Sequence, residues 1–147
     1  MIPHDRATEV TDAEGVAELL GMSYKTFRNK GGGAAFGLQP FEPSRRKLLF
    51  DRAQAEALAA DRPPPPRPAS GGEHPDDLLD EQDVAQALDI TYATVRKDRS
   101  AGRLGDDWTD VCGVAHIRRA TLHEVVKARP GRGVGGGRPR KVKAEDR

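Results

Sequence analysis

Apolar and polar residues alternate with helical spacing near the start of the chain. Val16, Ala17 and Leu20 lie on one face of a helix and follow Asp12, a residue type that caps helix N-termini. Gly21 then ends the pattern, because glycine adopts the left-handed conformation at a helix end without strain. The pattern predicts a first helix between Asp12 and Gly21.

A second helix is predicted directly after this glycine. Ser23 is suited to cap its N-terminus, and Thr26 and Phe27 occupy the positions expected to face inward. The outward positions hold a tyrosine and mostly basic or amide side chains, namely Tyr24, Lys25, Arg28, Asn29 and Lys30. Two helices separated by so short a step are typical of a helix-turn-helix unit.

The same layout recurs 68 residues later. Asp80 takes the place of Asp12, Asp89 that of Gly21, and Thr91 that of Ser23. Six further positions are identical between the copies: Val16 and Val84, Ala17 and Ala85, Leu20 and Leu88, Tyr24 and Tyr92, Thr26 and Thr94, Arg28 and Arg96. Thr94 and Val95 are therefore the expected inward residues of the second copy. The chain contains an internal repeat.

Each copy continues with an apolar, turn-rich stretch and a last helix. The stretches "FGLQPFEPSRRKLLF" (36–50) and "LGDDWTDVCGVAHI" (104–117) are each suited to a β-hairpin, with turns at 42–44 and 110–113. The segments "DRAQAEALAA" and "RRATLHEVVKAR" have helical patterns. Helix, turn, helix, hairpin and helix in this order predict a winged helix-turn-helix domain.

The fold class predicted for the whole chain is mainly α with small β-hairpin wings, in the α+β class. Two tandem winged helix-turn-helix domains are expected at 9–60 and 78–129. A Pro/Gly-rich linker, "DRPPPPRPASGGEHPDD", occupies 61–77, because its prolines remove amide donors. The last segment, 130–147, is rich in glycine and charge, and we expect a basic disordered tail.

The two copies resemble the winged helix-turn-helix of MerR-like regulators and excisionases. The resemblance is carried by "VTDAEGVAELLGMSYKTFRNK" with "RRKLLFDRAQAEALAA", and by "LLDEQDVAQALDITYATVRKD" with "AHIRRATLHEVVKAR". It implies sequence-specific binding of double-stranded DNA, with the second helix in the major groove and the wing on the neighbouring backbone. Full-length MerR-type regulators add a dimerisation coil and an effector pocket, and nothing in this sequence corresponds to them. We therefore expect no small-molecule effector.

The chemistry of the outward faces agrees with this implication. Base edges in the major groove present acceptors that Arg, Lys and Asn can match, and Arg28 and Arg96 are the first candidates for guanine contacts. The plainer interpretation is that each face is the solvated side of a surface helix. The DNA-binding residues predicted for the two copies are Ser23, Tyr24, Lys25, Thr26, Arg28, Asn29, Lys30, Arg45, Arg46, Lys47, Thr91, Tyr92, Thr94, Arg96, Lys97 and Arg99.

The two predicted wings differ in charge. The first carries Arg45, Arg46 and Lys47, which suit phosphate contacts, whereas the second carries acidic residues at 106, 107 and 110. Acidic groups repel the DNA backbone. The second copy is thus expected either to dock by its helix alone or to use its wing on a protein.

The tail adds a third basic element. Residues 130–147 hold six basic and two acidic residues, a local charge of +4 in a chain with a net charge of only +1. Within it, Gly137-Arg138-Pro139-Arg140 is similar to the core of an AT-hook, a minor-groove binder, and Lys141 extends the basic run. A generic basic tail with sequence-independent attraction is an equal alternative.

Composition argues against an enzyme. Hydrophobic residues make up 36% of the chain and charged residues 32%, with a mean hydropathy of −0.69, so any core is small. The sequence lacks G-x-S-x-G and phosphate-cradling loops. Cys112, His116 and His123 lack a fourth ligand for zinc, so no metal or cofactor is expected. A single cysteine and the absence of a signal core or membrane span predict a cytoplasmic protein, and the DNA binding that the resemblance implies would make it nucleoid-associated.

Two functions from different classes remain open at this point. The first is a sequence-specific DNA-binding protein, acting as a transcriptional repressor or regulator, or as an excisionase-like architectural factor of a mobile element. The second is an adaptor in packaging, partition or recombination, with domain 1 on DNA and domain 2 on a protein such as a recombinase or polymerase. A toxin-neutralising or purely structural module is a third possibility. For the first, a seventeen-residue linker allows two unlike half-sites about 34 Å apart.

Overall fold

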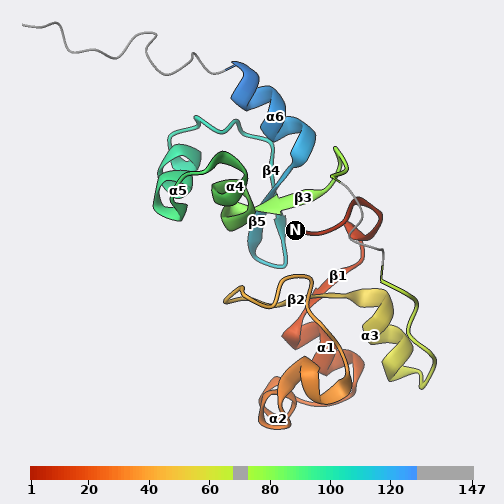
Figure 1. The fold of residues 1–147 in the computed structure, drawn as a ribbon. Helices are drawn as coiled ribbons and strands as arrows, with labels where there is room; N and C mark the ends of the chain where they lie inside the picture. Colours follow the sequence, from red (N-terminus) through yellow and green to blue (C-terminus); the bar gives the residue numbers. More distant parts are fainter. Residues whose placement is uncertain (68–72, 129–147) are drawn as a thin grey trace, which may run out of the picture.

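The computed structural model describes residues 1–67 and 73–128. This part of the chain is mixed α+β, with six α-helices and two small antiparallel sheets (Figure 1). None of its helices is long and apolar enough to cross a membrane. The elements form two groups, which we call the N-terminal half (residues 10–59) and the C-terminal half (residues 78–128).

The N-terminal half is built around a two-stranded sheet. Its elements, in chain order, are β1 (Val10–Asp12), α1 (Ala13–Leu19), α2 (Tyr24–Asn29), the 3-10 helix η2 (Gly32–Phe36), β2 (Leu49–Asp51) and α3 (Arg52–Ala59). β1 and β2 pair antiparallel, with Thr11 opposite Phe50. A short 3-10 turn, η1 (His4–Arg6), precedes the half.

The C-terminal half repeats this order with one more strand. Its elements are β3 (Leu78–Asp80), α4 (Glu81–Leu88), α5 (Tyr92–Ser100), β4 (Trp108–Val111), β5 (Val114–Arg118) and α6 (Arg119–Ala128). β5 is the central strand, antiparallel to both β3 and β4. Strand, helix, helix, strand, helix is common to both halves.

The predicted helix starts are confirmed. Asp12, Ser23 and Thr91 each accept a hydrogen bond from the backbone amide three residues later, at 3.0, 3.1 and 3.2 Å. Asp80 accepts from the amides two and three residues later, at 2.9 and 2.8 Å. These bonds satisfy donors that have no partner inside a helix.

The predicted ends of the first helices are also confirmed. Gly21 and Asp89 have φ values of 68° and 52°, in the left-handed region. Both therefore turn the chain sharply between two helices, so that α2 crosses α1 and α5 crosses α4. Asp89 tolerates the conformation better than most residues with a side chain, because Asp and Asn are enriched there.

Each half has its own apolar core. Phe27 and Val95 are buried at the centre of these cores, as predicted. The N-terminal cluster consists of Val16, Ala17, Phe27, Leu38, Phe50 and Ala55. The C-terminal cluster consists of Leu79, Val84, Ala85, Val95, Leu104, Ile117 and Leu122.

The inward orientation expected for Thr26 and Thr94 is wrong, because both side chains are exposed. Their hydroxyls lie 2.8 Å from those of the capping residues Ser23 and Thr91. Each threonine thus belongs to the polar cap at the helix start. One apolar residue per helix, Phe27 or Val95, is enough to anchor it.

The hairpin predicted at 36–50 is not present in the described residues. β2 pairs instead with β1, a strand ahead of the first helix that the sequence did not predict. Phe36 ends a 3-10 helix, and the prolines at 40 and 43 lack the amide donors that a ladder needs. A single backbone bond, from Phe41 N to Leu49 O at 2.9 Å, ties this loop to β2.

The hairpin predicted at 104–117 is confirmed as β4 and β5. Its turn lies at Cys112 and Gly113, whose φ values are 51° and 81°. Asp110 accepts a hydrogen bond from the amide of Gly113 at 2.8 Å, which closes the turn. β3 adds a third strand, which the sequence did not predict.

A third apolar cluster joins the two halves. Leu49 from β2, Leu78 from β3 and Ile2 form its buried centre. Ile2 and Leu78 exchange two backbone hydrogen bonds of 2.9 Å, so the N-terminal segment lies against β3 before the chain returns to form β1 (Figure 1). The halves therefore pack on each other directly, in addition to being joined by 61–77.

Candidate nucleic-acid interface

The outer face of α2 carries unpaired cations. Tyr24 is 43% exposed, and Lys25, Arg28 and Lys30 are exposed as well. Among the described residues, the side chains of these three cations form no ion pair. Asn29 is also exposed on α2. Figure 1 shows α2 at the end of the N-terminal half that lies away from the C-terminal half.

The outer face of α5 has the same character at its start. Tyr92 is 43% exposed, equal to Tyr24. The guanidinium of Arg96 lies 5.9 Å from the centre of the Tyr92 ring, and Lys97 is exposed beside it. Arg96 and Arg28 thus occupy equivalent exposed positions one turn after equivalent tyrosines.

Arg99, which the sequence placed in the same interface, is held by the protein. Its guanidinium lies 2.9 Å from the carboxylate of Glu81 and 5.4 Å from the centre of the Trp108 ring. These contacts fasten the end of α5 to the start of α4 and to β4. The first copy has Gly31 and Ala13 at the positions of Arg99 and Glu81, so this connection belongs to the C-terminal half.

The two tyrosines differ in their surroundings. Partial burial raises the pKa of Tyr92, and its hydrogen bond with the Glu81 carboxylate raises it further. In the N-terminal half, the position equivalent to Glu81 is occupied by Ala13, which offers the Tyr24 hydroxyl no carboxylate. Tyr92 is therefore oriented before any ligand binds, whereas the Tyr24 hydroxyl has no partner among the described residues.

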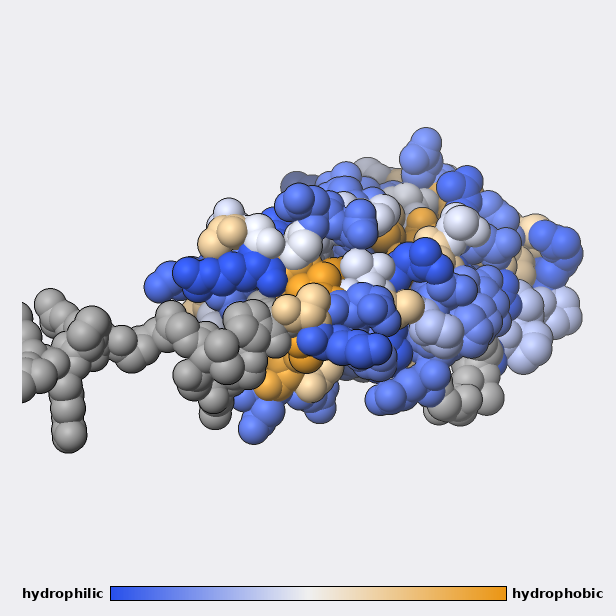
Figure 2. Space-filling model, turned by 90° about the horizontal axis from the view of Figure 1, so that it is seen from above, coloured by the Kyte–Doolittle hydropathy of each residue, from blue (hydrophilic) through white to orange (hydrophobic). Residues whose placement is uncertain are grey.

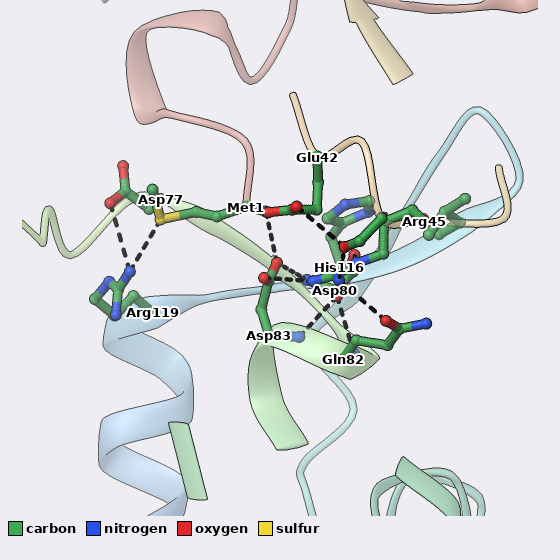
Figure 3. Close-up of polar contacts among 11 residues, drawn as sticks. Met1, Glu42, Arg45, Asp77, Asp80, Gln82, Asp83, His116 and Arg119 are labelled. Atoms are coloured by element: carbon green, nitrogen blue, oxygen red, sulfur yellow. Dashed lines mark hydrogen bonds and ion pairs between the residues drawn. The ribbon is translucent and has the colours of Figure 1, made fainter. Parts of the chain in front are cut away.

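Arg45 lies in the contact between the halves (Figure 3). Its Nε is 2.6 Å from Asp80, one terminal nitrogen is 2.7 Å from Asp83, and the other is 3.0 Å from the Gln82 side chain. The sequence predicted a phosphate contact for this residue. With its guanidinium nitrogens held by α4 and its capping residue, Arg45 instead fixes the position of the loop.

The neighbours of Arg45 are more accessible. Lys47 is exposed, with its Nζ 3.3 Å from Asp12. Arg46 is exposed, and its side chain has no hydrogen bond or ion pair in the part of the chain that the structure describes. We call Arg45, Arg46 and Lys47 the basic loop.

The acidic hairpin of the C-terminal half turns toward the N-terminal half. The Cys112 Sγ is 3.8 Å from the carbonyl oxygen of Val10, and Val111 and Val114 join the shared apolar cluster. A Cβ at Gly113 would lie 3.2 Å from the Lys47 Nζ. The sequence left two alternatives for the second copy: docking on DNA by its helix alone, or contact of its wing with a protein. In the structure the wing does contact protein, namely the N-terminal half of the same chain.

A cavity of about 150 Å³ lies between the halves. The basic loop, Glu42 and Phe41 line it from the N-terminal half, and Glu81, Tyr92 and His116 from the C-terminal half. The start of α5 and the basic loop are therefore neighbours, although they belong to different halves. Elsewhere the surface is largely polar: Figure 2 shows one face on which hydrophobic residues emerge only in small groups.

His116 is a buried titratable group in the wall of this cavity. Its Nδ1 lies 2.9 Å from the carbonyl oxygen of Val114, so this nitrogen carries the proton and donates it. Burial lowers the pKa of His116 below its usual 6.5, and this exceeds the opposing effects of Val114 and Asp80. His116 is consequently neutral in the folded protein near neutral pH.

We expect the stability of the protein to fall as the pH decreases from 7 to 5, in part through His116. The unfolded chain takes up a proton near pH 6.5 while the folded chain resists it, so stability is full above this pH and is lost toward the folded-state pKa. Urea denaturation at several pH values would measure the slope. His116→Gln should flatten it, whereas His123→Gln, on the exposed face of α6, should not; equal slopes in all three proteins would contradict the assignment.

Metal binding is not favoured by the one group of potential ligands found in the described residues. It consists of His4, His74 and Asp77, and excludes the Cys112, His116 and His123 considered from the sequence. The two imidazole rings stack at 3.6 Å and 15°, so their lone pairs run parallel and do not converge. His74 Nδ1 also accepts a hydrogen bond from the Asp76 amide. We interpret the group as a packing contact.

The structure thus divides the predicted site residues into three sets. Those on α2 and at the start of α5, together with Arg46 and Lys47, are exposed, whereas Arg45 and Arg99 are engaged within the protein. Arg138, Arg140 and Lys141 lie outside the described residues. The partners of Arg45 were not foreseen from the sequence, although Asp80 and Asp83 form a capping box that marks a helix start rich in carboxylates.

Comparisons with known proteins add no assignment. No protein-family model, no curated protein and no solved structure gave a significant match to the chain.

Proposed function

We propose that the chain binds double-stranded DNA through α2 and α5, as two tandem winged helix-turn-helix domains. The observation that carries the proposal is the repeated exposed face: a tyrosine and an arginine at equivalent positions of two capped helices, with Arg28 and Arg96 outside any ion pair among the described residues. Unpaired cations on a protruding helix suit the acceptors of the major groove. The role would be that of a transcriptional regulator or an excisionase-like architectural factor.

The two helices would read different sequences. Lys25 corresponds to Ala93, and Asn29 to Lys97, so the two faces present different donors. A bidentate contact from arginine to guanine contributes about 1–3 kcal/mol of discrimination. The target would then consist of two unlike half-sites that share a guanine contact.

The contact between the halves supports a target of defined geometry. Arg45 and the shared apolar cluster hold the halves together, so α2 and α5 would approach DNA from fixed positions. Preorganisation lowers the cost of binding the second helix once the first has bound. Half-sites at one spacing are therefore expected to bind better than the same half-sites moved apart by a few base pairs.

The proposal is tested by selecting bound duplexes from a random pool and measuring affinities for the selected sequence. We expect Arg28→Ala and Arg96→Ala each to weaken binding about 5- to 150-fold, the equivalent of 1–3 kcal/mol. Arg62→Ala is the matched control, because Arg62 is exposed but follows α3. Failure of the wild-type chain to bind any duplex in dilute buffer would refute the proposal.

The same variants separate the adaptor function from the two-headed one. If Arg28→Ala abolishes binding while Arg96→Ala leaves affinity and footprint unchanged, α5 does not read DNA and the C-terminal half becomes the candidate surface for a protein partner. Gel shifts with phased bends would distinguish an architectural factor, which bends its site, from a simple repressor.

A further inference from the structure

The structure brings a cation of the N-terminal half beside the recognition helix proposed for the C-terminal half. We propose that Arg46 contacts a DNA phosphate next to α5, so that the basic loop of one half completes the DNA-binding surface of the other. This inference rests on the proposed DNA binding by α5. It adds Arg46 as a contact residue and says which half of the protein supplies that contact.

The position of Arg46 is fixed by its neighbour. Arg45 is anchored to Asp80, Gln82 and Asp83 at the start of α4, and Arg46 follows it directly in the chain. Arg46 and Tyr92 line the same cavity. The loop is therefore held at the N-terminal end of α5, where Tyr92 is exposed to an incoming duplex.

Arg46 is available for a ligand. Its side chain is exposed and has no hydrogen bond or ion pair among residues 1–67 and 73–128. The acidic residues of the cavity wall are otherwise engaged: Asp80 pairs with Arg45 at 2.6 Å, Glu81 pairs with Arg99 at 2.9 Å, and Glu42 accepts a hydrogen bond from the Ser44 hydroxyl at 3.1 Å.

The charge near the other end of α5 favours this assignment, because a Cβ at Gly102, just after α5, would lie 3.9 Å from the Asp106 Oδ1. The hairpin of the C-terminal half carries exposed Asp106, Asp107 and Asp110, which repel phosphate, and its tip packs on the N-terminal half. A duplex that places α5 in its major groove would meet attraction from Arg46 near Tyr92, at the start of the helix, and repulsion from Asp106 near its end. The favourable backbone contact thus comes from the other half.

A contact of this kind has a measurable signature. Neutralising one phosphate releases counterions, so each such contact contributes about 0.9 to the slope of log affinity against log salt concentration. A phosphate contact carries no base information, so its loss weakens matched and mismatched duplexes equally.

The test measures the salt dependence of binding by the full chain to its selected duplex, together with hydroxyl-radical footprints. We expect Arg46→Ala to reduce the slope by about 0.9. We also expect it to weaken protection at the edge of the half-site that depends on Arg96. Arg46→Lys should retain most of the slope, because the charge remains, and Arg62→Ala should behave as wild type.

Two results would overturn the inference while leaving the proposed function intact. The first is an unchanged slope for Arg46→Ala in a protein whose binding still depends on Arg28 and Arg96. The second is a loss of protection confined to the half-site that depends on Arg28, which would assign the loop to α2. Absence of all duplex binding by the wild type would instead refute the proposed function itself.

Discussion

Replacing Arg45 with methionine is expected to lower the free energy of unfolding by about 3 kcal/mol, because removing one partner of a buried ion pair leaves charges without compensation. The Arg45 side chain is 16% exposed, and those of Asp80 and Asp83 are 10% and 11% exposed. The loss should lie at the lower end of the range of about 3–5 kcal/mol that removal of one partner usually costs, because both carboxylates keep other partners. Asp80 keeps two backbone donors, and Asp83 keeps the α-amino group of Met1 at 2.7 Å.

Urea denaturation of wild type and Arg45→Met at pH 7 measures this loss. Arg46→Met is the matched control: it removes an exposed arginine with no partner among the described residues, and should change stability by less than about 0.5 kcal/mol. Equal effects of the two variants would show that the Arg45 contacts do not stabilise the fold.

The unfolding free energies of wild type and Arg45→Met should become more similar at acidic pH. Burial opposes ionisation of Asp80, but Arg45 and the Asp83 amide outweigh it, so the pKa of Asp80 lies below its usual 3.8. A lowered folded-state pKa stabilises the protein above the unfolded value, and this stabilisation is lost as the pH falls through the folded value. The stability difference between wild type and Arg45→Met should therefore narrow below about pH 4.

Replacing Phe27 with alanine is expected to lower the free energy of unfolding by about 3–5 kcal/mol, which is a large part of the stability of a small protein. Phe27 is the only residue of α2 that is buried, at 1% exposure, and it stacks on Phe36 with ring centres 5.6 Å apart. Without it, α2 has six residues and one cap to keep it in place. Short helices depend on tertiary packing more than on intrinsic propensity.

Tyr24→Ala provides the control on the same helix. It removes an aromatic ring from an exposed position, so it should leave the thermal midpoint nearly unchanged while Phe27→Ala lowers it. Circular dichroism during heating would report both variants. A midpoint for Tyr24→Ala as low as that for Phe27→Ala would mean that Tyr24 also packs in the core.

The local features of the fold could be predicted from the sequence because each depends on a few neighbouring residues. A cap needs one polar side chain before the helix, and Asp12, Ser23, Asp80 and Thr91 all act as expected. The repeat strengthened these assignments, since an isolated cap signal is weak.

The pairing between distant segments could not be predicted in the same way. β1 and β3 have three residues each, too few for alternation of polar and apolar residues to show. β2 finds its partner 39 positions earlier, where Thr11 lies opposite Phe50. The apolar, turn-rich stretch at 36–50 favours a local hairpin, but the prolines at 40 and 43 lack the amide donors that its ladder would need.

The candidate site, like the fold, could be predicted where it depends on neighbouring residues and not where it depends on distant ones. The exposed faces of α2 and α5 follow from helical spacing, which places Phe27 or Val95 inward and the tyrosine and arginine outward. The role of Arg45 does not follow, because a basic triplet looks solvated until the carboxylate of Asp80, 35 residues away, is seen beside it.

The apolar cluster of Ile2, Leu49 and Leu78 is buried between the two halves, because Leu49 belongs to one half and Leu78 to the other. Either half produced alone would expose part of this cluster to water and lose the associated hydrophobic stabilisation. The two repeats are thus not independently folding units. The folding of each is thermodynamically linked to the folding of the other, and heat should unfold both in one cooperative transition.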